Sequence, residues 1–384
     1  MNNKEITYVL HHYKEEDLPF GAVSPPIFQT SIFSFKSFHD FSRALNDETN
    51  NYLYTRGNNP TVNILEEKIA ALEQGEKAKF FASGVAAIAS SVLAFVRSGD
   101  HIISVKDCYS WTQTLFERYL SRFGIETTFV EGTNVDEIED MIKPNTKIIY
   151  LESPTTFTFK LQNLRQIAVV AKKQGIRTIV DNSWATPYFQ QPINMGIDLV
   201  VHSASKYLGG HSDLVAGVVI GKRKEIEHIF KTEFLNIGAV IDPFTAWLIL
   251  RGLRTLHIRM QRHFESTMKV TKYLSSHPKV ERVIYPFLNS HPQFELAKRQ
   301  MSGGSGLFSI KLITGNINRI SKFVDKLRYF KKAVSWGGYE SLVFPYVISH
   351  PDAPKDLRSL VRLHIGLEEP EMLIKDLENA LKDL

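Results

Sequence analysis

Cysteine is almost missing from this sequence, in which Cys108 is the only one among 384 residues. A single thiol excludes an intramolecular disulfide, and so little cysteine is typical of proteins in a reducing compartment. Long apolar runs are missing as well, because no stretch reaches the roughly 18 residues that a membrane span needs. The first residues, Met1 to Ile6, form no apolar signal core. We therefore expect a cytoplasmic protein without a membrane partner.

Several short motifs that mark common chemistries are also absent. The chain has neither Gly-x-Gly-x-x-Gly nor Gly-x4-Gly-Lys-Ser/Thr, which mark nucleotide sites, and it has no Gly-x-Ser-x-Gly elbow. It contains no Cys-x-x-Cys or His-Glu-x-x-His, and the isolated His11-His12 pair is more typical of a surface than of a ligand set. We therefore predict no metal site.

The excess of positive charge is small. The chain has 46 Lys and Arg against 41 Asp and Glu, a formal net charge of +5, and the two signs are interleaved along it. Nucleic-acid-binding proteins more often concentrate basic residues in one patch, so we predict no nucleic-acid partner. A hydrophobic content of 43% is enough for a full core.

Short apolar runs alternate with helical periodicity from about residue 61 onward. Thr61 followed by Val62, Leu65 and Ile69 predicts an amphipathic helix with an N-cap. Runs that are apolar throughout fit strands buried on both faces of a sheet. The alternation predicts an α/β fold with a large, mostly parallel sheet. The expected strands are 79–82, 101–105, 147–151, 177–180, 198–201 and 215–220.

Three regions of the chain differ in pattern. Residues 1–60 are irregular and interrupted by prolines, which predicts an arm that packs on its own domain or on a neighbouring subunit. Residues 61–245 hold the alternating pattern and form the predicted large domain. Residues 246–384 are predicted to form a smaller α+β domain that ends in a helix after Glu371. One continuous helix over 243–274 is expected to lead into it.

Polar residues follow two of the predicted strands, where ligands bind in open parallel sheets. Asp181 ends one strand and Lys206 lies shortly after the next, so both are expected on one rim of the sheet. Taken singly, they fit a helix-capping aspartate and an exposed lysine. Taken together, they fit pyridoxal phosphate (PLP), because a lysine amine bonds to the aldehyde and an aspartate keeps the pyridine nitrogen protonated.

Small residues follow the first predicted strand. Ser83 to Ala87 open a helix there, and the first N–H groups of a helix can bind a phosphate. The same pattern also fits a plain turn between a strand and a helix.

The run from Ser203 to Asp213, Ser-Ala-Ser-Lys-Tyr-Leu-Gly-Gly-His-Ser-Asp, resembles the PLP-lysine signature of the Cys/Met metabolism enzymes. This family includes cystathionine γ-synthase, the cystathionine lyases and methionine γ-lyase. The resemblance extends from Gly21-Ala-Val-Ser-Pro-Pro-Ile to Arg362-Leu-His-Ile-Gly-Leu-Glu. It implies PLP as the cofactor, the aspartate-aminotransferase-like PLP fold type I, and a homotetramer built from dimers.

The resemblance also implies roles for individual residues at the cofactor. Lys206 corresponds to the lysine that holds PLP as a Schiff base and acts as the base, and Asp181 to the partner of the pyridine nitrogen. Tyr109 corresponds to a catalytic tyrosine that stacks on the ring. Further residues are implied at the phosphate: Ser203, Ser205, Gly84 and Val85 of the same subunit, and Tyr54 and Arg56 of a neighbouring one.

A second set of residues is implied at the substrate. Arg362 corresponds to the clamp for the substrate α-carboxylate, a role suited to a bidentate guanidinium. Ser335-Trp336-Gly-Gly is similar to bacterial cystathionine β-lyases, whose γ-specific relatives usually carry Leu in place of Trp. Ser335 and Trp336 are therefore expected beside the substrate, together with Tyr109.

The implied reaction is β-elimination from a small sulfur amino acid, with cystathionine giving homocysteine, pyruvate and ammonia. Thr156 stands where γ-enzymes commonly have Asn, and Trp111 stands where methionine γ-lyases usually have a reactive Cys, whereas Val334 replaces a tyrosine typical of some β-lyases. Three alternatives stay open: γ-elimination or γ-replacement, release of sulfide from cysteine, and a PLP-fold regulator without catalysis. The complete set of implied catalytic residues disfavours the last.

Overall fold

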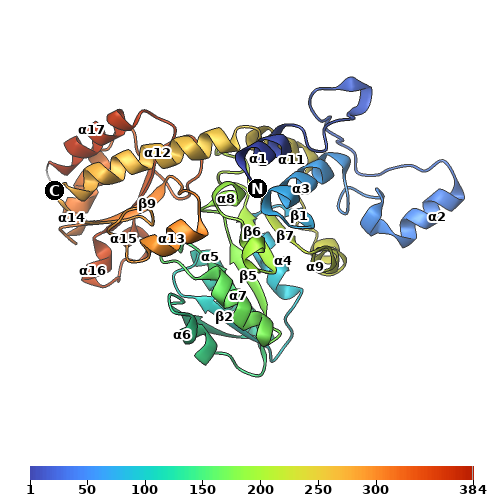
Figure 1. The fold of residues 1–384 in the computed structure, drawn as a ribbon, viewed down its shortest axis with the longest axis horizontal. Helices are drawn as coiled ribbons and strands as arrows, with labels where there is room; N and C mark the ends of the chain where they lie inside the picture. The colour runs from blue at the N-terminus through green and yellow to red at the C-terminus, as the bar shows by residue number, and fades with distance from the viewer. Residues whose placement is uncertain (383) are drawn as a thin grey trace.

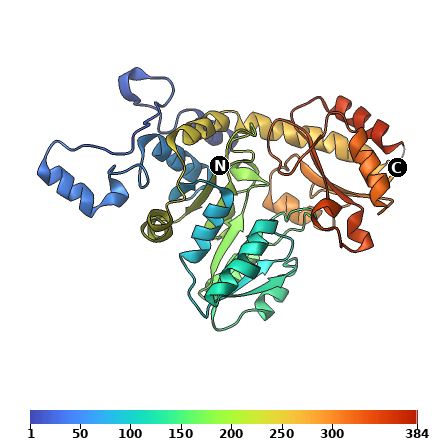
Figure 2. The same ribbon diagram turned by 180° about the vertical axis from the view of Figure 1, so that it is seen from behind.

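The chain folds around two sheets, as a computed structural model that describes residues 1–382 and 384 shows (Figures 1 and 2). The larger sheet has the strand order β1-β7-β6-β5-β4-β2-β3. The pairs β6-β5, β5-β4, β4-β2 and β2-β3 are parallel, whereas β7 is antiparallel to both neighbours. Its strands are β1 (Lys77–Phe81), β2 (His101–Val105), β3 (Glu126–Val130), β4 (Thr146–Glu152), β5 (Arg177–Asp181), β6 (Leu199–Ser203) and β7 (Gly217–Gly221).

Successive residues of the central strands enter different cores. Ile148 belongs to one buried cluster and Ile149 to another, and Val200 and Val201 divide in the same way. Because side chains alternate across a strand, a sheet buried on both faces reads as a continuous apolar run. The predicted α/β fold class is confirmed. The helices of this half are α3 (Pro60–Glu73), α4 (Gly84–Leu93), α5 (Ser110–Thr114), α6 (Val135–Asp140), α7 (Leu164–Lys173), α8 (Thr186–Phe189), α9 (Arg223–Ile229) and α10 (Leu235–Ile237).

The smaller sheet has five strands in the order β10-β11-β12-β9-β8. Helices α12 (Leu256–Ser275, yellow in Figure 1) and α17 (Pro370–Leu381, red) lie beside it. Its strands are β8 (Val280–Ile284), β9 (Leu307–Leu312), β10 (Lys331–Lys332), β11 (Leu342–Pro345) and β12 (Leu360–His364). The helices of this half are α11 (Pro243–Leu253), α12 (Leu256–Ser275), α13 (Phe294–Gln300), α14 (Ile317–Lys326), α15 (Tyr346–Ser349), α16 (Lys355–Arg358) and α17 (Pro370–Leu381).

One expectation about the elements was wrong, and one strand of the larger sheet was missed. The helix expected over 243–274 is broken between α11 and α12, because Arg259 and Thr255 donate hydrogen bonds to the Gly252 carbonyl, which then no longer serves a continuous helix. Strand β3 was not foreseen. Its residues are mostly half-buried and three of the five are polar, which is typical of an edge strand and weakens the apolar signal.

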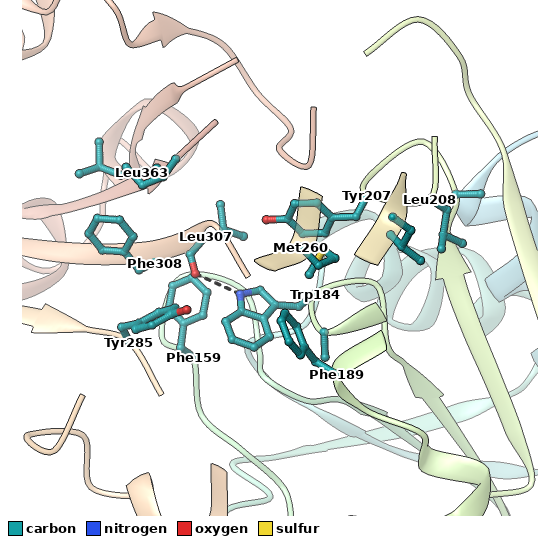
Figure 3. Close-up of a cluster of buried hydrophobic side chains, with 14 of the residues drawn as sticks. Phe159, Trp184, Phe189, Tyr207, Leu208, Met260, Tyr285, Leu307, Phe308 and Leu363 are labelled. Carbon is teal, nitrogen blue, oxygen red and sulfur yellow. Dashed lines mark hydrogen bonds between the residues drawn. The ribbon is translucent and has the colours of Figure 1, made fainter. Parts of the chain in front are cut away.

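A buried aromatic cluster joins the two sheets (Figure 3). Trp184, which follows β5, donates its indole N–H to the Leu307 carbonyl of β9 over 3.0 Å. Tyr207 lies in the same cluster and is fully buried, directly after Lys206 in the chain. The segment that carries Lys206 is therefore anchored from both halves of the molecule.

The first 60 residues include an extended segment whose tip lies well away from both sheets in Figures 1 and 2. Helix α1 (Asn3–His11) packs near α3, but α2 (Phe38–Asn46) lies at the tip of the arm and buries only Ala44. The base of the arm is fixed, since Trp247 donates its indole N–H to the Pro25 carbonyl. Within the described residues, no helix combines the length and the apolar character that crossing a membrane requires.

Candidate active site

Three neighbouring strands of the larger sheet end in polar residues at one rim. Glu152 ends β4, Asp181 ends β5 and Ser203 ends β6. Glu152 and Asp181 are paired in register, so their side chains leave the sheet side by side. Lys206 follows β6 by three residues. The structure therefore brings Lys206 and Asp181 to the same rim, as their positions after successive strands predict.

Lys206 is half-buried and held at its amine. Its Nζ donates a hydrogen bond to Ser335 Oγ over 2.5 Å and lies 5.4 Å from the centre of the Trp336 ring. Burial, and then the positive charge of Arg362, lower the pKa of the Lys206 amine to about 8, against the charge of Asp181. Near neutral pH this lysine therefore releases a proton far more readily than a solvated lysine does.

Asp181 is buried and faces the rim. Its Oδ1 accepts a hydrogen bond from the Ser183 N–H over 2.9 Å, which fixes the carboxyl at the end of β5. Burial raises the pKa of Asp181, whereas the hydrogen bonds from Ser183 oppose this rise. A cationic ring nitrogen beside this carboxyl would favour its ionised form.

Glu152 is a rim residue that the sequence interpretation missed. Its Oε2 accepts the Tyr109 N–H over 2.7 Å, and its Oε1 accepts the Thr156 N–H over 2.8 Å. Burial and then the neighbouring Asp181 raise the pKa of Glu152. The available signal was the same as for Asp181, because Glu152 also ends an apolar run.

Backbones approach each other unusually closely where α4 begins. A Cβ at Gly84 would lie 3.0 Å from the Ser203 side chain, and one at Gly217 would lie 2.3 Å from the Ser83 carbonyl oxygen. Ser83 caps α4 through the Ala86 N–H. The N–H groups of Gly84 and Val85 have no partner inside the helix, because the first turn never does. Together with Ser203 they form a cradle suited to a phosphate.

Ser205 has a partner of its own within the chain. Its hydroxyl donates to the Ala216 carbonyl over 3.2 Å and accepts the Ala216 N–H over 3.0 Å. This exchange connects the segment after β6 to the segment before β7. A phosphate contact by Ser205 would compete with one of these bonds.

Arg362 lies on β12 at the side of the smaller sheet that meets the rim. The residue is 8% exposed, and its Nη1 donates to Thr156 Oγ1 over 3.0 Å. Its guanidinium lies 4.7 Å from the Phe157 ring centre and 5.3 Å from that of Phe344. Burial lowers the pKa of Arg362 to about 10, so it stays cationic at neutral pH. Thr156, Phe157 and Phe344 were not foreseen as its neighbours.

Tyr109 immediately precedes α5 and is 43% exposed, with its backbone fixed by Glu152. Burial, followed by the charges of Asp181 and Glu152, raises the pKa of Tyr109. Its phenol therefore carries its proton near neutral pH. Tyr109 therefore lies close enough to Asp181, Glu152 and Arg362 for their charges to shift its pKa.

Tyr54 and Arg56 are not brought to this rim within one chain. They lie on the arm and line an open cavity of about 370 Å³ with residues such as Val240 and Asp242. The Arg56 guanidinium lies 5.6 Å from the Tyr54 ring centre. Among the described residues, no hydrogen bond or ion pair joins either of them to Lys206, Asp181 or Arg362.

The residues at the rim fit PLP. The cradle at α4 is suited to a phosphate, Asp181 offers a buried carboxyl, and Lys206 offers an amine of lowered pKa at the same rim. No group of three or more potential metal-binding side chains occurs in the part of the chain that the structure describes. The cradle at α4, the buried Asp181 carboxyl and the Lys206 amine together favour an organic cofactor with an anionic group.

Comparison with known proteins points to the same chemistry. Residues 6–382 match the family model described as Cys/Met metabolism PLP-dependent enzyme. A cystathionine beta-lyase of Lactococcus lactis subsp. cremoris is 41% identical, with 98% of each chain covered. An L-methionine gamma-lyase of Fusobacterium nucleatum subsp. nucleatum is 39% identical, with 95% of each chain covered. A cystathionine gamma-lyase of Bacillus subtilis is 38% identical, covering 99% of this chain and all of its own.

Proposed function

We propose that this chain, which belongs to the Cys/Met metabolism PLP-dependent enzyme family, is a carbon–sulfur lyase that cleaves cystathionine by β-elimination. The products would be homocysteine, pyruvate and ammonia. The observation that carries the proposal is the convergence of Lys206, Asp181 and Arg362 at one rim, with Trp336 beside the Lys206 amine. Membership of the family makes PLP the cofactor.

PLP, when bound, supplies an electron sink that stabilises negative charge at the substrate Cα. We assign its pyridine nitrogen to Asp181 and its phosphate to Gly84, Val85 and Ser203. Lys206 would hold the cofactor before the substrate arrives. Ser205 contributes less than the resemblance implies, because its hydroxyl already pairs with Ala216.

Substrate binding is assigned to Arg362 and its surroundings. A carboxylate can bind the outer edge of the guanidinium while Thr156 occupies Nη1. Phe157 and Phe344 flank the guanidinium and restrict its movement. Such a buried, oriented cation would fix the substrate Cα relative to the Lys206 amine.

Lys206 is assigned the proton transfers. With a pKa near 8, its neutral form is accessible at mildly alkaline pH and can remove the Cα proton. Tyr109 retains its proton, because its pKa is raised, and so can donate to the leaving sulfur. Both groups lie close enough to Arg362 and Asp181 for those charges to act on their pKa values.

γ-Elimination is the second candidate, because two of the relatives described above are γ-lyases at nearly the same identity. A γ-lyase must also remove a proton from Cβ, whereas a β-lyase needs only the Cα proton. Trp336, Thr156 in place of the Asn common in γ-enzymes, and Trp111 in place of the reactive Cys of methionine γ-lyases support β-elimination. If the enzyme proves to be a γ-lyase, these three residues do not determine which carbon–sulfur bond is cleaved.

The test is the product formed from cystathionine by the purified, PLP-loaded protein. The proposal predicts pyruvate and homocysteine in equal amounts, with Lys206→Ala as the inactive control. Release of 2-oxobutyrate and cysteine would replace the β-lyase proposal with the γ-lyase one. Absence of any keto acid from cystathionine, cysteine or methionine would remove the lyase proposal.

We also propose that the active unit is a dimer, and the assembly a tetramer of two dimers. The tip helix α2 exposes an apolar side that includes Phe38, Phe41 and Leu45, which a second copy could cover. Tyr54 and Arg56 would then complete the phosphate site of that copy. The division into an arm (1–60), a large domain (61–245) and a small domain (246–384) stays part of this proposal.

A further inference from the structure

His364 ends β12, two residues after Arg362. Side chains at positions i and i+2 of a strand lie on the same face, so both residues leave β12 on one side. His364 is fully buried, and its ring contacts those of Tyr207 and His263, with centroids 5.8 and 5.4 Å away. Strand β12 therefore carries both Arg362 and His364, and the His364 ring contacts Tyr207, which directly follows Lys206.

Both ring nitrogens of His364 bind backbone groups of one loop, residues 335–340. The Gly337 N–H donates to Nε2 over 3.1 Å, and Nδ1 lies 3.0 Å from the Glu340 carbonyl oxygen. Nε2 accepts and therefore has no proton, so Nδ1 is the protonated nitrogen and donates to Glu340. Burial lowers the pKa of His364 well below its usual range, which keeps this neutral form.

The 335–340 loop is the part of the smaller half that touches Lys206. Ser335 accepts the Lys206 amine hydrogen bond, and Trp336 lies against the same amine. A Cβ at Gly337 would lie 2.9 Å from the Lys206 Cα, so the loop backbone is pressed against the lysine. Ser335 has φ +81°, a conformation that a serine adopts only when its surroundings impose it.

We infer that His364 is a positioning residue, which holds the 335–340 loop against Lys206 through one donated and one accepted hydrogen bond. The inference rests on the function proposed for Lys206. It explains why an imidazole serves at this position: a ring of fixed geometry with a donor and an acceptor on opposite sides spans the two backbone groups. A serine hydroxyl is too short to reach both.

His263 provides a matched control. It is also fully buried, its ring centroid is 5.0 Å from that of Tyr207, and its Nδ1 lies 2.8 Å from the Ile365 carbonyl oxygen. No described hydrogen bond joins it to the 335–340 loop. If buried imidazoles served only to fill the core here, the two histidines would be equivalent.

Two substitutions separate the two nitrogens of His364. Asn places its amide near the position of Nδ1, so His364→Asn keeps a donor for Glu340 and loses the acceptor for Gly337. Gln places its amide near Nε2, so His364→Gln can accept the Gly337 N–H. Hydrogen–deuterium exchange of the cofactor-free protein, read in peptides that cover 335–340, measures the loop directly.

We expect about fivefold faster exchange in this loop for His364→Asn than for the wild type, the effect of losing one hydrogen bond. His364→Gln should restore much of the protection, and His263→Asn should leave the loop unchanged. Equal exchange of the loop in all four proteins would overturn the inference. Should His364→Asn fail to fold, faster loop exchange in His263→Asn than in His364→Gln would overturn it as well.

The consequence at Lys206 gives a second readout. Competitive acetylation across pH reports the pKa of the Lys206 amine in the cofactor-free protein. When the loop loosens, water reaches the amine and its pKa rises, by about one unit in His364→Asn. If the 335–340 loop exchanges faster in His364→Asn but the pKa of the Lys206 amine equals that of the wild type, His364 does not act on Lys206. Neither readout depends on which carbon–sulfur bond the enzyme breaks, so failure of the inference and failure of the proposed lyase activity are separate results.

Discussion

The rim of the larger sheet and the N-terminal arm differ in whether their residues find partners within a single chain. At the rim, Glu152, Asp181 and Lys206 have partners and a fixed place within the chain. On the arm, Tyr54 and Arg56 line an open cavity, and α2 leaves its apolar side uncovered. The sheet fixes the side chains at its strand ends, whereas the side chains of the arm depend on the surface against which the arm packs. The predictions below test the two regions separately.

The largest effect is expected at the rim. Lys206→Ala removes both the proposed attachment point of the cofactor and the proposed base, so the rate of keto acid formation should fall by at least about a thousandfold. The fold should survive, because Lys206 is only half-buried and forms no ion pair with any residue that the structure describes. Steady-state assays and circular dichroism together check this. Substantial residual turnover by a folded variant would contradict the assignment.

The second prediction addresses the arm. Arg56→Ala and Lys206→Ala should each be inactive alone, but mixing them allows hybrid dimers in which one of the two sites is intact. Random exchange of subunits gives about a quarter of wild-type activity, because half of the dimers are hybrids with one active site each.

No recovery after verified subunit exchange would show that Arg56 does not act in a neighbouring site. Full activity of Arg56→Ala alone would show that the arm contributes no phosphate contact. Either result would separate the arm from the chemistry at the rim.

A smaller effect is expected for Glu152→Gln. The amide has one acceptor in place of two, so either Tyr109 or Thr156 loses the partner of its N–H. We expect kcat/KM to fall by roughly tenfold, because a buried donor is left unpaired. Glu126→Gln is the control, since Glu126 pairs with Lys143 at the exposed surface of β3. Equal effects of the two substitutions would remove Glu152 from the site.

The smallest effect on activity is expected at Cys108, in the packing beneath the rim. Cys108 is buried, and burial raises the pKa of its thiol, so little thiolate is present. Alkylation by iodoacetamide at pH 8 should be about a hundredfold slower in the native protein than in urea. Cys108→Ala should retain nearly full activity. Rapid alkylation of Cys108 in the folded protein, with a parallel loss of activity, would show that reagent reaches the thiol and that it is not buried.

Much of the fold was predictable because its signals are local. Continuous apolar runs located β2, β4, β5 and β6, and the strand-helix alternation indicated the α/β class. The half-polar edge strand β3 and the break between α11 and α12 were missed. Both depend on tertiary surroundings, in the second case on the capture of the Gly252 carbonyl by Arg259.

The candidate site was predictable to a different depth. Asp181 and Lys206 follow from the order of strands, and their resemblance to a family signature sharpened the assignment. Glu152 was overlooked although it also ends a strand, and His364 could not be recognised as a loop support. Its two hydrogen bonds join residues that are 24 and 27 positions away, and no local pattern records such contacts.

The most direct test of this account is to locate the cofactor on the chain. Treatment of the PLP-loaded protein with borohydride, followed by digestion and mass spectrometry, should place the reduced cofactor on Lys206 alone. That result is expected from an amine of lowered pKa at the end of β6, close to Asp181. Finding the label on another lysine, with Lys206 unmodified, would contradict the central claim that this rim is the active site.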